Sequence, residues 1–183
     1  RGRNATWITV DIVSGDAGGL TATFVFMGPV ESALHHDAVP PPAGHVAPDA
    51  AAPVPDTPDT PVFFATHMEA RHAVPPGGPR RPEVDFWMRV GGHEAMDPMA
   101  VILLVADAPP PSVVRMLGRR VPISSMLWQV NVLTPAPATR DGWWLCQSAS
   151  DYAARGCSRE RLTVWNTDGV PMVTGMQSVA IFG

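Results

Sequence analysis

The stretch Asp97-Pro-Met-Ala-Val-Ile-Leu-Leu-Val-Ala-Asp107 decides the fold of this chain. Asp97 is a residue type favoured at the cap of a helix, and Pro98 suits the first helical position. Three consecutive prolines at positions 109–111 then end the helix, because the residue before a proline disfavours helical dihedral angles. The sequence therefore predicts a short, apolar, buried helix over residues 97–107.

Asp107 conflicts with the rest of this helix. On a period of 3.6 residues it shares a face with Ala100, Leu103 and Leu104, so its carboxyl group falls in an apolar stripe. It also lies at the helix C-terminus, where the helix dipole disfavours an anion by roughly 0.3–1 kcal/mol. A residue that breaks local rules twice is a candidate for function. The alternative is that Asp107 only caps the following turn.

Strand patterns lie on both sides of the helix. Strands are predicted upstream at residues 63–72 and 84–90, and downstream at about 123–133, 143–152, 157–166 and 172–182. Hairpin turn signals stand at residues 155–156 and 167–169. Two strands, one apolar helix and four antiparallel strands indicate an α+β fold, in which an antiparallel sheet wraps around one buried helix.

The first 61 residues differ from this pattern. Residues 6–13 and 20–26 predict a β-hairpin, which must join a larger sheet because two strands alone are marginal in water. Residues 29–61 are rich in Pro, Ala and Asp without any period, and they predict a linker that is partly disordered. The chain starts without Met and close to a strand, so we expect a fragment whose upstream part is missing.

Composition argues against several classes of function. The 183 residues carry a net charge of −4, so electrostatics favour neither nucleic acid nor an anionic membrane as a partner. Two cysteines give no disulfide framework and no metal-ligand spacing. No signal-peptide pattern is evident and the longest apolar run is too short for a bilayer, so a reducing cytoplasm is expected. A Gly-x-Ser-x-Gly elbow and a Gly-rich phosphate loop are both missing.

The order and spacing of the segments resemble the acyl-CoA thioesterase II family. The matching stretches lie within about residues 63–182. In chain order they are Asp85-Phe-Trp-Met-Arg89, the helix ending in Leu-Leu-Val-Ala-Asp107, Gly142-Trp-Trp-Leu145, Leu162-Thr-Val-Trp-Asn-Thr-Asp-Gly169 and Met176-Gln-Ser-Val-Ala-Ile-Phe182. The resemblance implies a hotdog fold, here as a partial double hotdog. Residues 1–28 would be the last hairpin of a truncated first hotdog, residues 29–61 a linker, and residues 62–183 the second hotdog domain.

The resemblance also implies a catalytic site. The family uses an Asp, a Thr or Ser, and a Gln to position the water that attacks the thioester carbonyl. Asp107 matches the Asp, and Gln177 matches the Gln in the last strand. No Thr stands early in the strand after the helix, where the register leaves three matching positions open: Pro122, Ile123 or Ser124. Ser124 can supply the hydroxyl, and Ser125 is the next candidate.

Strand alternation gives these residues independent support. It places Gln177 on a face with Val173, Val179 and Ile181, and Ser124 on a face with three apolar residues: Met126, Trp128 and Val130. A buried amide needs a partner, and a carboxylate in an apolar setting has a raised pKa and is a better base. The alternatives are a satisfied core amide and a structural serine.

The resemblance implies an enzyme of lipid metabolism that hydrolyses acyl-CoA to a fatty acid and CoA, without a metal or redox cofactor. The expected partners are the acyl-CoA substrate and further copies of the chain, which would form a homo-oligomer through hotdog sheets. A module that binds acyl-CoA without hydrolysis is one alternative, favoured by the missing Thr. A hydratase or dehydratase is another, disfavoured because no His lies close in sequence to Asp107. The third is a fragment that is inactive alone.

Overall fold

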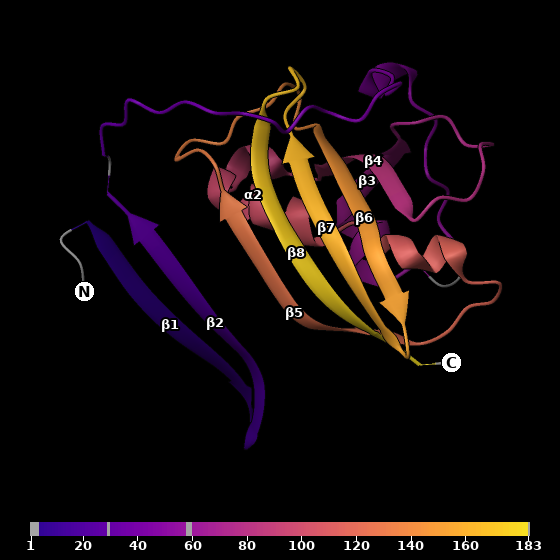
Figure 1. The fold of residues 1–183 in the computed structure, drawn as a ribbon, viewed down its shortest axis with the longest axis horizontal. Coiled ribbons are helices and arrows are strands. Elements are labelled where there is room, and N and C mark those ends of the chain that lie inside the picture. Colours follow the sequence, from indigo (N-terminus) through magenta and orange to yellow (C-terminus); the bar gives the residue numbers. More distant parts are fainter. Residues whose placement is uncertain (1–3, 29, 58–59, 183) are drawn as a thin grey trace. The chain divides into compact units, whose positions relative to one another are not determined.

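Antiparallel sheets make up most of the protein. A computed structural model describes residues 4–28, 30–57 and 60–182 (Figure 1). The chain divides into two units, Arg1–Ala38 and Val39–Gly183. The first contains a two-stranded sheet, and the second contains a six-stranded sheet.

The first unit is a hairpin of β1 (Ala5–Ser14) and β2 (Ala17–Met27), which confirms the predicted hairpin. Most of its large apolar side chains are exposed, including Trp7 at 55% and Phe26 at 56%. A two-stranded ribbon has no second layer against which to bury them.

The second unit carries all six strands expected around the helix. They are β3 (Met68–His72), β4 (Glu83–Val90), β5 (Ile123–Val132), β6 (Trp144–Ala154), β7 (Cys157–Trp165) and β8 (Pro171–Ile181). The sheet order is β3-β4-β6-β7-β8-β5, and all neighbours are antiparallel. The predicted antiparallel sheet is therefore confirmed.

One predicted strand begins later than expected. Residues of α1 (Val62–His67) form a short helix, so the strand predicted from residue 63 starts only at Met68. Met68 pairs with Val90, the last residue of β4, and a Gly-Gly turn follows Val90. The residues before Met68 therefore have no neighbouring strand with which to pair.

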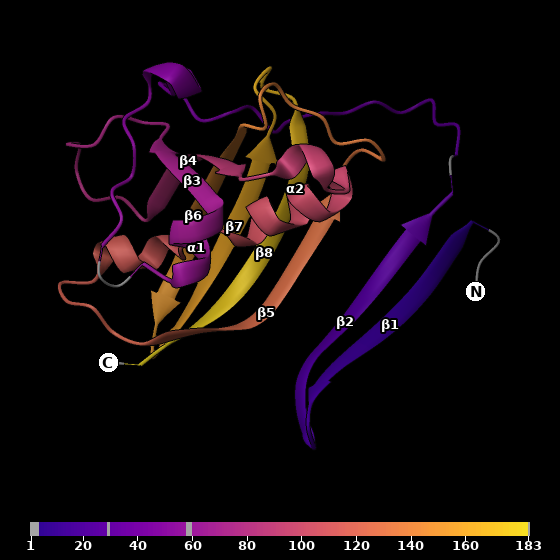
Figure 2. The ribbon, with the colours of Figure 1, turned by 180° about the vertical axis from the view of Figure 1, so that it is seen from behind.

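The helix α2 (Pro98–Asp107) covers one face of the sheet, called here the inner face (Figure 2). Its start is capped as predicted, because Asp97 accepts hydrogen bonds from the backbone N–H groups of Met99 at 2.8 Å and Ala100 at 3.3 Å. The buried side of α2 packs into a core with residues of the inner face, among them Met88, Trp144, Cys146, Val164 and Val173.

The helix is buried on one side only. Val101, Ile102 and Val105 are buried, whereas Ala100 and Leu104 are exposed. The predicted buried helix is therefore confirmed on one side, and the stripe that carries Asp107 is more exposed than expected. Val101, Ile102 and Val105 have larger, β-branched side chains, and the side of the helix that carries them faces the sheet.

Residues 39–51 pack on the outer face of the sheet and residues 52–54 pair with the edge strand β3, although both segments were predicted to belong to a linker. The indole N–H of Trp165 donates to the carbonyl of Val39 at 2.8 Å, and that of Trp87 donates to the carbonyl of Val46 at 2.7 Å. Ala51 is buried in the same cluster. From Val39 on, this irregular segment thus packs against the sheet; the assignment of the domains remains a prediction.

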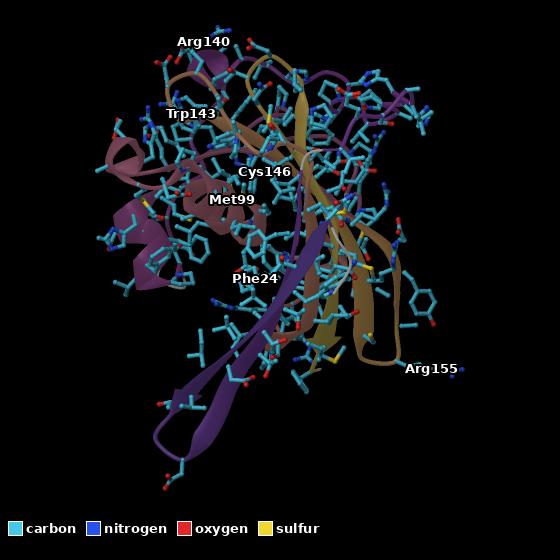
Figure 3. All side chains as sticks on the ribbon, turned by 90° about the vertical axis from the view of Figure 1, so that its left-hand side faces the viewer. Phe24, Met99, Arg140, Trp143, Cys146 and Arg155 are labelled. Carbon is cyan, nitrogen blue, oxygen red and sulfur yellow. The ribbon has the colours of Figure 1, made fainter. Side chains whose placement is uncertain are left out.

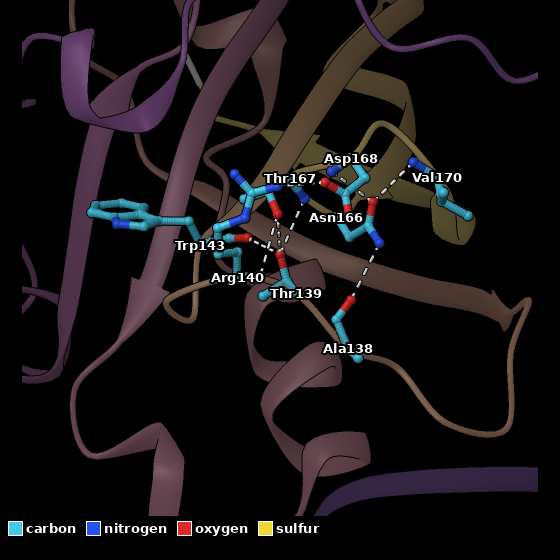
Figure 4. Close-up of polar contacts among 8 residues, drawn as sticks. All are labelled: Ala138, Thr139, Arg140, Trp143, Asn166, Thr167, Asp168 and Val170. Carbon is cyan, nitrogen blue, oxygen red and sulfur yellow. Dashed lines mark hydrogen bonds and ion pairs between the residues drawn. The ribbon is translucent and has the colours of Figure 1, made fainter.

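The turn between β7 and β8 is locked to the loop that precedes β6 (Figure 4). The side-chain oxygen of Asn166 accepts from the N–H groups of Asp168 at 3.0 Å and Val170 at 2.9 Å, which closes the turn predicted at residues 167–169. The hydroxyl of Thr139 accepts from the N–H of Thr167 at 3.1 Å. These bonds fix the end of the sheet at which β8 begins.

A single segment of the described chain, Pro98–Met116, is long and apolar enough to cross a membrane by length and composition, with a mean hydropathy of 1.4. In the structure it consists of α2, the prolines and the 3-10 helix η3 (Ser112–Met116). Core helices of folded proteins meet the same criterion, and α2 buries one of its sides in the core.

Candidate active site

Gln177 and Ser125 are joined on the inner face of the sheet. The Nε2 atom of Gln177 donates a hydrogen bond to the Oγ atom of Ser125 at 2.7 Å. Gln177 is half-buried on β8, and its partner across the sheet is Trp128 on β5. Trp128 packs against the core beneath α2, so the polar pair lies at the margin of that core.

An irregularity in β5 decides which serine faces Gln177. The pairing of β5 with β8 shifts register between Ser125 and Leu127, so Met126 is an extra residue. An extra residue interrupts the regular alternation of side chains between the two faces. Ser125 consequently lies on the face of Gln177, and Ser124 lies on the opposite face. The predicted face of Ser124 was wrong because it assumed uninterrupted alternation.

Asp107 is the last residue of α2, the helix that covers the inner face (Figure 2), and the pair of Gln177 and Ser125 belongs to the same face. Its side chain is exposed, yet nearby protein atoms remove part of its water, and this desolvation raises the pKa of the carboxyl group above its ordinary value. Among the residues that the structure describes, none donates a hydrogen bond to the Asp107 carboxylate. The carboxylate therefore does not act as a cap for the following turn and can accept from a water.

Cys146 does not offer a nucleophile. Its side chain is fully buried between the sheet and α2, where Sγ lies 3.9 Å from the carbonyl oxygen of Val105 (Figure 3). Burial raises the pKa of the Cys146 thiol far above its ordinary value, so the reactive thiolate is suppressed. The chemistry of the inner face therefore depends on its oxygen and amide groups.

Sequence reasoning missed three polar groups of the inner face. Trp128 has a buried indole N–H without a partner in the described structure, and Trp144 has another. Glu160 on β7 is 1% exposed and pairs directly with Gln177 of β8. Its flanking residues are both arginines, so residues 159–161 look like a solvated charged strand. Only strict alternation would have indicated that Glu160 faces inward.

An open groove lies between η3 and the start of β5. Its volume is about 1000 Å³, and its lining residues are Val114, Leu117, Gly118, Arg119, Arg120, Val121, Pro122 and Ile123. Residues 108–140 contain four arginines and neither Asp nor Glu, although the whole chain has a net charge of −4. The groove is thus locally basic, and it ends two residues before Ser125.

Comparison with known proteins decides the family. A family model of the acyl-CoA thioesterase C-terminal domain matches residues 48–181. The chain belongs to this family. The match begins within the predicted linker, in the segment that packs on the outer face. No curated protein matches the sequence.

Solved structures agree on the fold. A hot dog fold protein of unknown function from Alicyclobacillus acidocaldarius superposes with a TM-score of 0.82 at 21% identity, over 100% of this chain and 69% of that one. An acyl-CoA thioesterase II from Mycobacterium marinum gives 0.64 at 15% identity, over 100% and 70%. A tesB protein from Mycobacterium avium subspecies paratuberculosis gives 0.72 at 16% identity, over 100% and 68%. The predicted family resemblance and hotdog fold are confirmed.

Proposed function

We propose that this protein hydrolyses acyl-CoA thioesters to a free fatty acid and CoA. Membership in the acyl-CoA thioesterase family supports thioester hydrolysis in general. The observation that carries the finer proposal is the hydrogen-bonded pair of Gln177 and Ser125, on the side of the sheet where Asp107 ends α2. In the proposed reaction these three groups, a base, an amide and a hydroxyl, act on one water and one carbonyl group.

Each group has a distinct role in the proposed reaction. The carboxylate of Asp107 accepts a proton as water attacks the thioester carbon, and its raised pKa makes it a stronger base than a solvated Asp. Gln177 gives one N–H to Ser125 and keeps its carbonyl oxygen to hold the water. Ser125 accepts from Gln177 and keeps its own O–H to donate to the developing oxyanion. The C–S bond then breaks, and the CoA sulfur takes the proton.

We place the phosphate groups of CoA in the basic groove before β5. Arginine suits phosphate because its planar guanidinium offers several N–H donors at once. From Arg120 to Ser125 an extended chain spans about 17 Å, at roughly 3.4 Å for each of five residues. The pantetheine arm of CoA covers a comparable distance between its phosphates and its sulfur. This length is the greatest separation that the chain allows between Arg120 and Ser125, so one acyl-CoA molecule can reach from the groove to the polar pair.

Thiol release from acyl-CoAs of increasing chain length, measured beside calorimetric binding of the same compounds, tests this proposal. We expect saturable hydrolysis for at least one chain length. Saturable binding without thiol release would favour the non-catalytic module instead, which the missing Thr at residues 122–124 supports. If the protein neither binds nor hydrolyses any of these acyl-CoAs, both functions are refuted. The absence of a cofactor, the cytoplasmic location and the homo-oligomer remain predictions.

A further inference from the structure

Glu160 is a carboxylate buried without a cation. Its Oε2 atom accepts hydrogen bonds from the N–H of Ser112 at 2.9 Å, the hydroxyl of Ser112 at 2.6 Å and the hydroxyl of Ser148 at 3.4 Å. Its Oε1 atom accepts from the hydroxyl of Ser158. No ion pair joins Glu160 to an arginine or histidine within residues 4–28, 30–57 and 60–182. Hydrogen bonds alone compensate the burial of this group.

A buried carboxylate held only by hydrogen bonds is unusual for a residue that merely fills the core. Burying a carboxylate is costly unless it is fully hydrogen-bonded, and apolar side chains of similar volume often serve stability as well or better. The next inward-facing residues of β7, Leu162 and Val164, are apolar and pack into the core. Glu160 and the buried Ser158 therefore form a polar end to a strand face that is otherwise apolar, and departures from an apolar core concentrate at functional sites.

The hydrogen bonds of Glu160 reach the segment that carries Asp107. Ser112 is fully buried and opens η3, and only Ala108 and three prolines separate it from Asp107. Proline fixes its own φ angle and restricts the residue before it, so residues 108–111 form a stiff connection. Anchoring Ser112 consequently restricts the direction in which the chain leaves Asp107.

The same residue also borders the amide of the site. Glu160 is the direct cross-strand partner of Gln177, so both side chains project from the inner face at the same level of the sheet. One carboxylate thus joins the exit of α2, through Ser112, to the strand neighbour of Gln177. Asp107 and Gln177 come from elements far apart in the sequence.

We propose that Glu160 is a positioning residue, which holds Asp107 in register with Gln177 and Ser125 through its two hydrogen bonds to Ser112. This inference rests on the proposed function, because Asp107 is the base in that reaction. Catalysis is sensitive to such positioning, and a displacement of about 1 Å can lower a rate by roughly 100-fold.

Two variants weaken the contact in different ways. Ser112→Ala removes the hydroxyl donor and keeps the backbone one, whereas Glu160→Gln turns one acceptor atom into a donor without changing the shape. We expect kcat to fall by roughly 10-fold to 100-fold in either variant, with KM changed by less than about twofold. The matched control is Asp85→Asn, the same change of group on the outer face, where Asp85 accepts from Gln147 at 2.7 Å. Its kcat should stay near that of the parent.

A double-mutant cycle separates positioning from general stability. If Ser112 and Glu160 act through Asp107, Ser112→Ala should not lower further the residual rate of Asp107→Asn. An equal fractional loss in both backgrounds would show a structural role and overturn the proposal. So would an unchanged kcat in a folded Ser112→Ala protein.

Hydrogen exchange gives a readout that does not need activity. In Glu160→Gln and Ser112→Ala, the amides at residues 105–108 should exchange faster than in the parent, whereas Asp85→Asn should leave them unchanged. Unchanged exchange in both variants would overturn the proposal even in an active enzyme. Faster exchange in the variants of a protein that releases no thiol from any acyl-CoA would support the positioning role of Glu160 and reject thioester hydrolysis.

Discussion

Gln177 donates its 2.7 Å hydrogen bond to Ser125, a residue 52 positions earlier in the chain that is not its direct partner across the sheet. The direct partner is Trp128, and the extra residue Met126 lies between Trp128 and Ser125. The bulge therefore decides which hydroxyl meets the amide. It supplies a Ser on the inner face, although no Thr occupies the early positions of this strand.

Replacing Ser124 and Ser125 separately by Ala tests which serine acts together with Gln177. Ser125→Ala should lower kcat by roughly 10-fold to 100-fold because it removes both a partner of Gln177 and an oxyanion donor. Ser124→Ala should have little effect, since Ser124 faces the other side. Gln177→Ala should lower kcat similarly. The double variant Ser125→Ala/Gln177→Ala should lose less kcat than the product of the two single losses. Steady-state thiol release measures all four proteins, and a damaging Ser124→Ala would contradict the assignment.

The dependence of the rate on pH should report Asp107. Its carboxyl group acts as a base only when ionised, and desolvation raises its pKa. We therefore expect kcat/KM to fall on the acid side with a midpoint above the ordinary value of an Asp. An acid limb at or below that ordinary value would exclude Asp107 as the base.

The same pKa shift has a consequence for stability. A carboxyl whose pKa is raised in the folded state destabilises the fold as the pH rises from its unfolded pKa through its folded pKa. Asp107→Asn removes this penalty, so its Tm at neutral pH should equal or exceed that of the parent. Thermal unfolding at neutral pH, and again below the unfolded pKa, measures the difference. A lower Tm for the variant at neutral pH only would contradict this reasoning.

Two tryptophans provide a matched test of the segment on the outer face. Trp165 and Trp144 are 2% and 3% exposed, but only Trp165 donates its indole N–H, to Val39. Trp165→Phe should therefore cost about 1 kcal/mol more than Trp144→Phe, the usual net value of one hydrogen bond. Urea unfolding gives both free energies. Equal losses would mean that the contact to Val39 does not stabilise the second unit.

The basic groove predicts a selective effect on substrate binding. Changing Arg119 and Arg120 together to Ala should raise KM for acyl-CoA roughly 10-fold, and less at high salt, where surface charges are screened. A truncated thioester without the nucleotide should show no change in KM. Arg155→Ala is the control, because Arg155 stands exposed at the tip of the hairpin between β6 and β7 (Figure 3). An equal change in KM for both substrates would contradict the proposal that CoA binds in the groove.

Local signals predicted the elements of this fold, and long-range contacts decided the site. The capping by Asp97 and the alternation of the strands are local, so helix and sheet were found from the sequence. The bulge at Met126 leaves no such signal, because neither Gly nor Pro marks it. The burial of Glu160 depends on Ser112, 48 positions earlier, and the two flanking arginines conceal it.

The Pro-rich segment shows the same limit. Its composition is typical of a flexible linker, and its described residues, 30–57 and 60–61, form almost no regular secondary structure. Its order from Val39 onward depends on indole groups more than forty residues away, at Trp87 and Trp165. Composition describes the segment by itself and contains no information about these partners.

Thiol release from acyl-CoA by the parent protein and by Asp107→Asn, at equal concentrations of folded protein, tests the central claim most directly. The carboxyl and the amide have the same shape, so the comparison isolates the ability to accept a proton. We predict that the parent releases thiol and that the variant loses at least roughly 100-fold in kcat, as for removal of a general base. Equal turnover by the two proteins would contradict the account, because Asp107 would then not activate the water.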